Sequence, residues 1–294
     1  MEKGTQSVNP RAKIQLIALD LDGTVLNTQK HITKRTLDAI RAAIAQGVTV
    51  IPATGRLRNG LTQEFLDIEG VRYALTANGA AVLDLQTGER LFEGCLSREE
   101  ALWQYRATRK WDVMFDVYSG GVIATERRLF PRLSEFAPAE MVPYFHKTRT
   151  CVDDMEAFIM QCSAPIEKVT MLFTRPEERL EALEALADGG RFLVTTSIPG
   201  NAEVNAKGVD KGVGLLALAK HLGIAQESVM ACGDSSNDAA MLRAAGFAVA
   251  MGNATPDIRA LADVITDTND EDGVAKAIEK YVLAVSRDES GGQQ

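Results

Sequence analysis

Residues 14–24 read IQLIALDLDGT, an apolar run that ends in two acidic residues and a glycine. The run is short and bounded by polar residues, which predicts a strand buried on both faces, as in a parallel sheet. Asp20 and Asp22 follow it directly. Because successive residues of a strand point to opposite faces, the two carboxylates project the same way and can meet at one spot.

A helix and a second strand are expected next. Thr33 suits the N-cap of the helix, and Gly47 suits the left-handed residue at its end. Three residues give the helix an apolar stripe: Leu37, Ile40 and Ile44. Residues 48–53 (VTVIPA) predict another buried strand, in which Pro52 is tolerated with strain or at a sheet edge. Together these segments make a β-α-β unit.

The same alternation returns near the C-terminus. A helix over about residues 211–221 precedes the predicted strand 229–232, and a helix through Met241 precedes the strand 247–251 and the short strand 264–265. Alternation at both ends of the chain predicts an α/β fold. Its centre is one doubly wound, Rossmann-like parallel sheet whose two halves are separated in sequence.

The middle of the chain is richer in aromatic residues and arginine than either end. Its candidate strands alternate polar and apolar residues: 113–118, 122–125, 168–173 and 191–196. Two helix starts there carry capping-box pairs: Ser97 with Glu100, and Thr174 with Glu177. We therefore expect a discontinuous core domain, residues 14–84 and 199–285, interrupted by an inserted α+β domain at residues 85–198. The polar segments 1–13 and 286–294 are expected to be disordered tails.

Composition narrows the classes of function. The chain has 294 residues and a formal net charge of -8, so it offers no broad cationic surface for nucleic acid or an anionic membrane. The four cysteines are widely spaced, with no CxxC pair, which favours reduced thiols over a zinc site. No secretory signal and no apolar run of ~20 residues is found, so we expect a cytoplasmic protein. The oligomeric state stays open.

Four polar clusters follow predicted strands or begin a helix, where an open α/β sheet binds its ligands. The first is the pair Asp20 and Asp22 with Gly23. Asp-Gly between apolar stretches is also a common hairpin turn, and the local sequence leaves that alternative open. Two acids at the end of a buried strand are nevertheless costly unless a cation meets them.

The second and third clusters are weak when taken singly. Thr54, Gly55 and Arg56 follow the strand 48–53, and a hydroxyl with successive backbone N–H groups there can hold phosphate oxygens. Lys211 stands at a helix start, where a cation opposes the helix dipole. That placement suggests an anionic neighbour, although a solvated surface lysine is the plain alternative.

The fourth cluster, GDSSND at residues 233–238, follows the strand 229–232. Ser236 or Asn237 would serve as an ordinary N-cap, but Asp234 and Asp238 need a further reason. A hard cation that prefers oxygen ligands supplies one. Taken together, the four clusters provide a nucleophile, an acid/base, a lysine, a phosphate-holding loop and metal ligands.

Competing motifs are poor. The glycine pattern at residues 212–217 matches a dinucleotide fingerprint only loosely, because it follows no clear apolar strand. The chain has no GxxxxGK[ST], HExxH or GxSxG motif. Its three histidines have no evident catalytic partners: His31, His146 and His221.

The clusters resemble the four motifs of the haloacid dehalogenase-like (HAD) phosphatases, in particular the Cof-type members with a large C2 cap between the second and third motifs. The motifs are DLDGT at residues 20–24, ATGR at 53–56, KG at 211–212 and GDSSNDAAML at 233–242. The resemblance covers about residues 14–281. It implies that the inserted domain is a cap that closes over the site.

The resemblance also implies a role for each matching residue. Asp20 would be the nucleophile and Asp22 the general acid/base. Mg²⁺ would be bound by Asp20, the backbone carbonyl of Asp22 and Asp234, with Asp238 in support. The phosphoryl oxygens would be held by three residues of the 53–56 loop and three groups outside it: Thr54, Gly55 and Arg56, then Leu21 N–H, Lys211 and Asn237. Asn78 resembles a family segment beside the site entrance.

The implied activity is a Mg²⁺-dependent phosphatase for small phosphorylated metabolites, such as sugar phosphates or phosphorylated cofactors, that works through an aspartyl-phosphate on Asp20. A phosphomutase of the same superfamily is one alternative, and a phosphorylatable regulatory module is another. Five residues of the inserted domain could face the substrate, although solvated charge and small-domain core are the favoured interpretations: Trp111, Tyr118, Arg127, Arg128 and Tyr144.

Overall fold

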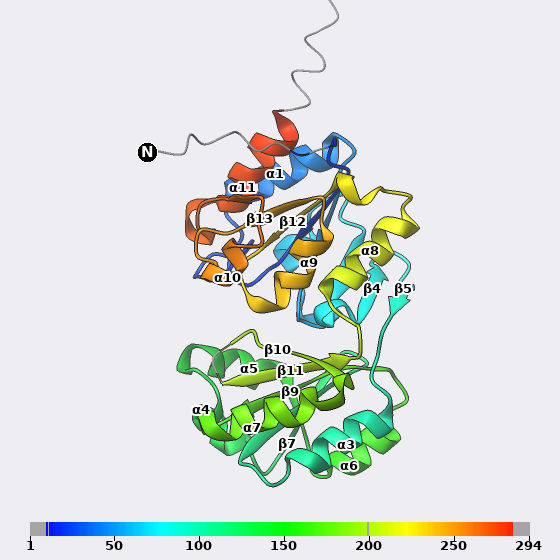
Figure 1. Ribbon diagram of the computed structural model, residues 1–294, viewed down its shortest axis with the longest axis vertical. Coiled ribbons are helices and arrows are strands. Elements are labelled where there is room, and N and C mark those ends of the chain that lie inside the picture. Colours follow the sequence, from blue (N-terminus) through cyan, green and yellow to red (C-terminus); the bar gives the residue numbers. More distant parts are fainter. Residues whose placement is uncertain (1–9, 11, 199, 285–294) are drawn as a thin grey trace, which may run out of the picture.

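The computed structural model describes residues 10, 12–198 and 200–284, which form two bodies stacked along the long axis of the molecule (Figure 1). Both ends of the described chain belong to one body, the core domain, and the middle of the chain forms the other, the cap. The tail expected at residues 286–294, and most of the one expected at 1–13, lies outside the described residues.

The core contains the predicted parallel sheet, with strand order β14-β13-β12-β1-β2. Its strands are β1 (Leu16–Leu19), β2 (Thr49–Pro52), β12 (Val229–Gly233), β13 (Phe247–Ala250) and β14 (Val264–Ile265). Strands β1 and β12 are neighbours, with Leu19 paired to Cys232. The chain winds outward in opposite directions from this pair, so the carboxyl ends of β1 and β12 form the switch point where such sheets bind ligands. Pro52 lies on an edge strand of the sheet, as expected.

The core helices are α1 (Lys34–Ala45), α2 (Gln63–Leu66), α8 (Lys211–His221), α9 (Ala239–Ala244), α10 (Pro256–Arg259) and α11 (Gly273–Ile278). Helix α1 packs against α11, and α8 packs against α9. Thr33 caps α1 through the backbone N–H of Thr36, and Gly47 takes a φ of 82°, both as predicted. Asp210 caps α8 by accepting from the backbone N–H of Val213.

A second, antiparallel sheet extends the core, which the sequence did not predict. It contains β3 (Tyr73–Thr76), β4 (Ala81–Asp84) and β5 (Arg90–Glu93). A bridge between Ala53 and Leu75 attaches it beyond β2. Strand β5 falls within the range expected for the inserted domain, but its backbone pairs with β4, and Phe92 packs on the core cluster.

The cap has a six-stranded sheet of order β10-β11-β9-β6-β7-β8. Its strands are β6 (Val113–Ser119), β7 (Val122–Glu126), β8 (Arg149–Val152), β9 (Ile166–Phe173), β10 (Phe192–Thr195) and β11 (Asn201–Ala206). All four predicted strands are present. Strand β11 was expected in the core, yet it pairs with β9 and β10. We propose that the chain crosses between domains near residues 94–97 and 207–210.

The two faces of the cap sheet differ. Helices α3 (Arg98–Thr108), α6 (Met155–Gln161) and α7 (Pro176–Ala187) cover one face over an apolar cluster that contains Phe115 and Met171. The short helices α4 (Leu133–Phe136) and α5 (Val142–Thr148) pack on Met114 and Leu172 of the other face. We call this second face, which also carries Asp116, Tyr118, Lys168, Thr170, Glu203 and Asn205, the inner face.

The two expected capping boxes differ in outcome. At α3 the box of Ser97 and Glu100 is formed in both directions. At α7 the Thr174 hydroxyl donates to Asp112 of a neighbouring loop, and the helix begins at Pro176. Across the described parts of the chain, no helix is both long and apolar enough to cross a bilayer.

Candidate active site

Lys211 brings two of the predicted acids together. It is the first residue of α8, and its side chain is fully buried. Its Nζ lies 2.6 Å from Oδ1 of Asp20, at the end of β1, and 2.6 Å from Oδ1 of Asp238, beyond β12. From its position at a helix start we expected Lys211 to have an anionic neighbour, and it has two. Helix α8 and two strands of the parallel sheet therefore meet at one charged centre.

The loop after β12 is folded around Asp238. Its Oδ2 accepts from the backbone N–H groups of Asp234, at 3.0 Å, and Ser235, at 3.1 Å. These bonds point the Asp234 side chain toward the DLDGT segment, where the Thr24 hydroxyl donates to Asp234 Oδ1 over 2.8 Å. Gly23 allows the two segments to come this close. It has a φ of 83°, and a Cβ there would lie 2.5 Å from Asp234 Oδ2. Glycine is thus required for both conformation and space.

The resulting carboxylate cluster is suited to a hard cation. Asp20, Asp234 and Asp238 each offer an oxygen, and these atoms lie within 4.8 Å of one another. Burial raises the pKa of Asp20 well above its usual range, against the opposing effect of Lys211. Burial and the adjacent Asp238 raise the pKa of Asp234 to about 7. One lysine does not balance three neighbouring acids, of which Asp20 and Asp238 are buried, and oxygen ligands of this kind suit a divalent ion such as Mg²⁺.

Asp22 does not join this cluster through its side chain. Arg56 binds it in a bidentate pair, with both N–H···O distances 2.8 Å, and Lys30 donates to it over 2.9 Å. Burial alone would raise the pKa of Asp22, but the hydrogen bonds and positive charges of Arg56 and Lys30 together outweigh burial and lower the pKa to about 2. The side chain is therefore an anion held at the rim, whereas the metal contact implied by the resemblance uses its backbone carbonyl.

The Thr54–Arg56 loop lies beside the cluster, but its arginine turns away. The Arg56 side chain contacts Asp22 and also donates to the carbonyl of Gly60. The Thr54 hydroxyl accepts from the backbone N–H of Arg56 over 3.2 Å, which tightens the turn. The structure thus places Arg56 on the expected acid/base residue, where we had expected it to help hold phosphate. Leu21 is fully buried in the core cluster, so its side chain is not available to a ligand.

Asn78 connects the site to the cap. It sits in a left-handed conformation with a φ of 57°, which asparagine tolerates better than most residues. Its Oδ1 accepts from Nδ2 of Asn237 over 3.2 Å, and its Nδ2 donates to Glu203 of the cap. Both predicted asparagines therefore lie in one hydrogen-bonded chain that runs from the GDSSND loop to the inner face.

The sequence analysis missed the cap residues that reach this chain. Lys168 Nζ lies 3.1 Å from Oε2 of Glu203, and both residues are buried. The signal for Lys168 was weak, because a charged residue in an alternating predicted strand ordinarily faces solvent. Glu203 stands in NAEVNA, which alternates polar and apolar residues strictly, so a signal for strand β11 was also present.

The five cap residues singled out from the sequence divide into two groups. The Arg56 guanidinium carbon lies 5.5 Å from the centre of the Tyr144 ring, and Lys168 Nζ lies 4.7 Å from the centre of the Tyr118 ring. Both tyrosines therefore face the candidate site. The others serve the cap itself: Arg127 pairs with Asp153, Arg128 pairs with Glu126, and Trp111 packs edge-on against Phe173.

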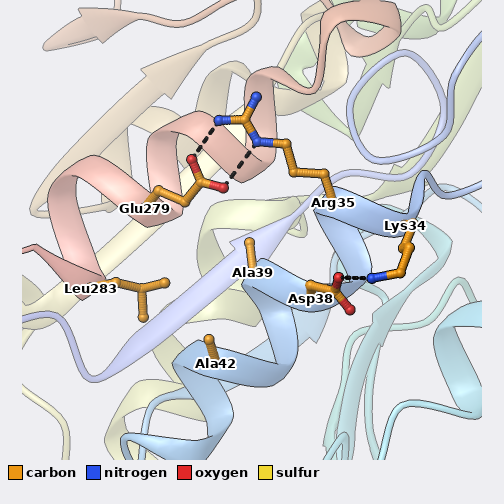
Figure 2. Close-up of a pocket in the computed structure, with 7 residues that line it drawn as sticks. All are labelled: Lys34, Arg35, Asp38, Ala39, Ala42, Glu279 and Leu283. Atoms are coloured by element: carbon orange, nitrogen blue, oxygen red, sulfur yellow. Dashed lines mark hydrogen bonds and ion pairs between the residues drawn. The ribbon is translucent and has the colours of Figure 1, made fainter.

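A hollow of about 530 Å³ lies elsewhere, between α1 and the C-terminal turn Glu279–Leu283 (Figure 2). Its charged side chains are paired with one another, Arg35 with Glu279 and Lys34 with Asp38. It contains none of the predicted site residues, so we do not regard it as the active site.

Comparison with known proteins agrees with the site. The model of the haloacid dehalogenase-like hydrolase family matches residues 17–278. A Bacillus subtilis protein named 5-amino-6-(5-phospho-D-ribitylamino)uracil phosphatase YcsE is 33% identical over 270 residues, covering 92% of this chain and 96% of its own.

Two solved structures extend the likeness to the whole fold. A haloacid dehalogenase-like hydrolase from B. subtilis superimposes with a TM-score of 0.80 at 26% identity, covering 91% of this chain and 99% of its own. The HAD subclass IIB sugar phosphatase BT4131 gives 0.75 at 28% identity, covering 90% and 98%. These findings confirm the resemblance carried by the four motifs, and the chain belongs to the haloacid dehalogenase-like hydrolases as a phosphatase of that family.

Proposed function

We propose that this phosphatase hydrolyses monoesters of small phosphorylated metabolites, with Mg²⁺ as cofactor and Asp20 as the residue that is transiently phosphorylated. The observation that carries the proposal is the buried contact of 2.6 Å between Asp20 Oδ1 and Lys211 Nζ, inside a cluster of three carboxylates. Lys211 binds one oxygen of Asp20, and the other oxygen, Oδ2, is the atom that attacks phosphorus in our proposal.

The reaction then takes two steps. In the first, Asp20 forms a bond to phosphorus while the ester P–O bond breaks, and Asp22 gives its proton to the leaving oxygen. In the second, water attacks the phosphorus, its proton passes to Asp22, and the Asp20–phosphorus bond breaks to release phosphate. The ion pair with Arg56 keeps Asp22 deprotonated in this structure, so Asp22 must leave Arg56 and take up a proton from solvent before the first step. The proton that it then gains from water in the second step serves the next cycle.

The remaining residues neutralise negative charge or hold the groups that do so. An ionised carboxylate and a phosphate dianion repel each other, so Lys211 neutralises part of the charge on both. Bound Mg²⁺ would neutralise more and orient the phosphoryl group; Asp20, Asp234 and the Asp22 backbone carbonyl would hold it. Asp238 keeps Lys211 and the Asp234 backbone in place. The phosphoryl oxygens would be held by Leu21 N–H, Thr54, Gly55 and Asn237.

The substrate class is proposed by analogy with the relatives. The names of YcsE and BT4131 specify a phosphorylated ribitylaminouracil and a sugar phosphate. Both have a phosphoryl group on a small hydroxylated carbon chain or ring. A buried site covered by a cap suits small molecules of this size rather than a macromolecule.

The direct test is phosphate release from p-nitrophenyl phosphate and from a panel of metabolite phosphates, with Mg²⁺ and with EDTA. We expect turnover with Mg²⁺, its loss with EDTA, and a loss of at least about a thousandfold in Asp20→Asn. Turnover by Asp20→Asn at the wild-type rate would exclude Asp20 as the phosphorylated residue. Turnover unaffected by EDTA would exclude the metal.

A further inference from the structure

One cation of the cap lies directly against the phosphate loop. Lys168 projects from the inner face of the cap sheet, with only 2% of its surface exposed. The point where a side chain on Gly55 would begin is 3.3 Å from Lys168 Nζ and 2.9 Å from Asn78 Oδ1. Lys168 is therefore a second lysine beside the reaction centre, and it comes from the other domain.

The described contacts of Lys168 Nζ include the ion pair with Glu203 and the Tyr118 ring, 4.7 Å away. An ammonium has three N–H donors, and in the described structure the carboxylate that it pairs with is Glu203. Glu203 is less dependent on the pair, since Ser197 donates to it over 2.7 Å and Asn78 donates to it as well. Burying a lysine is costly unless its donors are used. The arrangement is that of a cation held in position for a ligand.

Neighbouring groups on the inner face have unused oxygens as well. Thr170 pairs in register with Glu203 on one side and Asp116 on the other. The Thr170 hydroxyl and Asp116 Oδ1 are buried and make no hydrogen bond of normal length among the described residues, although the Tyr118 and Thr125 hydroxyls lie near them. A donor beside unused acceptors suits an oxygen-bearing molecule, whose hydroxyl groups both donate and accept, better than a hydrocarbon or an aryl ring.

We propose that Lys168 is a specificity-determining residue, which donates a hydrogen bond to an oxygen of the leaving group while Glu203 and Asn78 hold it in place. This inference rests on the proposed phosphatase activity at Asp20. The cap then selects substrates whose leaving group carries a hydroxyl or other oxygen close to the phosphoester, and it contributes little to the phosphoryl group itself.

The test compares two substrates that differ in the leaving group. One is the best hydroxylated metabolite phosphate found with the wild-type enzyme, and the other is p-nitrophenyl phosphate. In Lys168→Met we expect the ratio of kcat/KM for the first over the second to fall about 10- to 100-fold, mainly through KM, because hydrogen bonds to charged groups have this strength. An unchanged ratio would overturn the proposal, including the case in which both substrates lose equally.

Two further variants separate specificity from folding. Lys168→Arg keeps the charge that pairs with Glu203, and we expect it to fold and still to change the ratio, because a guanidinium places its donors differently. If Lys168→Arg leaves the ratio of kcat/KM values unchanged, Lys168 does not bind the leaving group. Arg106→Gln, at an exposed pair with Glu156 on α3, is the matched control and must keep the wild-type ratio. A wild-type enzyme without any turnover would instead overturn the phosphatase proposal.

Discussion

At the scale of single residues, Lys211 is the side chain on which the site depends most. It is fully buried between Asp20 and Asp238, so its removal leaves two carboxylates unpaired. For Lys211→Met we expect a loss of about a hundredfold or more in kcat/KM, and of about 3–5 kcal/mol in the free energy of unfolding of the metal-free protein. Steady-state kinetics and urea denaturation measure the two effects.

The control for Lys211 lies on the same helix. Lys220, in the last turn of α8, is exposed, and Lys220→Met should change neither quantity beyond about 0.5 kcal/mol. If Lys211→Met were as stable and as active as this control, the buried pairs would be structurally and chemically irrelevant, contrary to the site described above.

The raised pKa of Asp234, about 7, predicts how pH controls metal binding. A carboxyl whose pKa rises on folding binds more protons in the folded chain, so the metal-free protein loses stability as pH rises from about 4 through about 7. Mg²⁺ requires the ionised form, so the rise in Tm on adding Mg²⁺ should be larger at pH 8 than at pH 5.5. Thermal unfolding at the two pH values measures it, and an equal rise at both would contradict the prediction.

At the scale of elements, the approach of the Ala77–Gly79 turn to helix α8 is decisive. Gly79 has a φ of 94°, and a Cβ there would lie 2.0 Å from the backbone oxygen of Asp210, the residue that caps the helix. Gly79→Ala should therefore displace the start of α8 and with it Lys211. We expect a loss of more than about 2 kcal/mol in unfolding free energy, together with a fall in kcat.

Gly47→Ala separates the clash from the conformational strain. Gly47 has a similar φ of 82°, but no atom lies within 4 Å of the Cβ position. That variant should lose about 1 kcal/mol of stability and keep its kcat. Denaturation curves and kcat measured for Gly79→Ala and Gly47→Ala test this difference. Equal losses of stability and of kcat in the two variants would mean that the contact of Gly79 with α8 is not tight.

At the scale of the whole molecule, hydrogen bonds across the domain boundary hold the cap on the core. Besides Asn78 with Glu203, Asn205 Nδ2 donates to the Ala77 carbonyl over 2.8 Å, and Ser236 donates to the Thr196 carbonyl over 2.6 Å. Each is worth about 1 kcal/mol. A small apolar cluster also spans the boundary, with Leu57 and Ala77 of the core against Tyr118 and Ile123 of the cap. Contacts of this limited kind suit a domain that we expect to open when substrate enters.

Asn205→Ala tests this closure. Losing its bond to Ala77 should shift the molecule toward an open form, seen as a larger radius of gyration in X-ray scattering and a KM raised several-fold. The matched control is Gln161→Ala, at an exposed position of α6 in the cap. If Asn205→Ala scattered and bound substrate like the control, the boundary contacts would not govern closure.

The parallel sheet, the alternation of its strands and helices, and most of the candidate site residues could be predicted from the amino-acid sequence. Alternating apolar runs are local signals, and residues such as Asp20, Lys211 and Asp234 stand at strand or helix ends, where this type of sheet must bring them together. The ends of strands and the starts of helices are set by neighbouring residues in the chain, so they can be predicted from local sequence.

Only the tertiary structure decided which partners these residues have. It paired Asp22 with Arg56, gave β5 to the core and β11 to the cap, and brought Lys168 against Gly55. Each depends on contacts between segments far apart in the chain, and the polar–apolar alternation of β11 predicts a strand without indicating which strands it pairs with. The cap side of the site is therefore a property of packing between domains, where the sequence has no local pattern to reveal it.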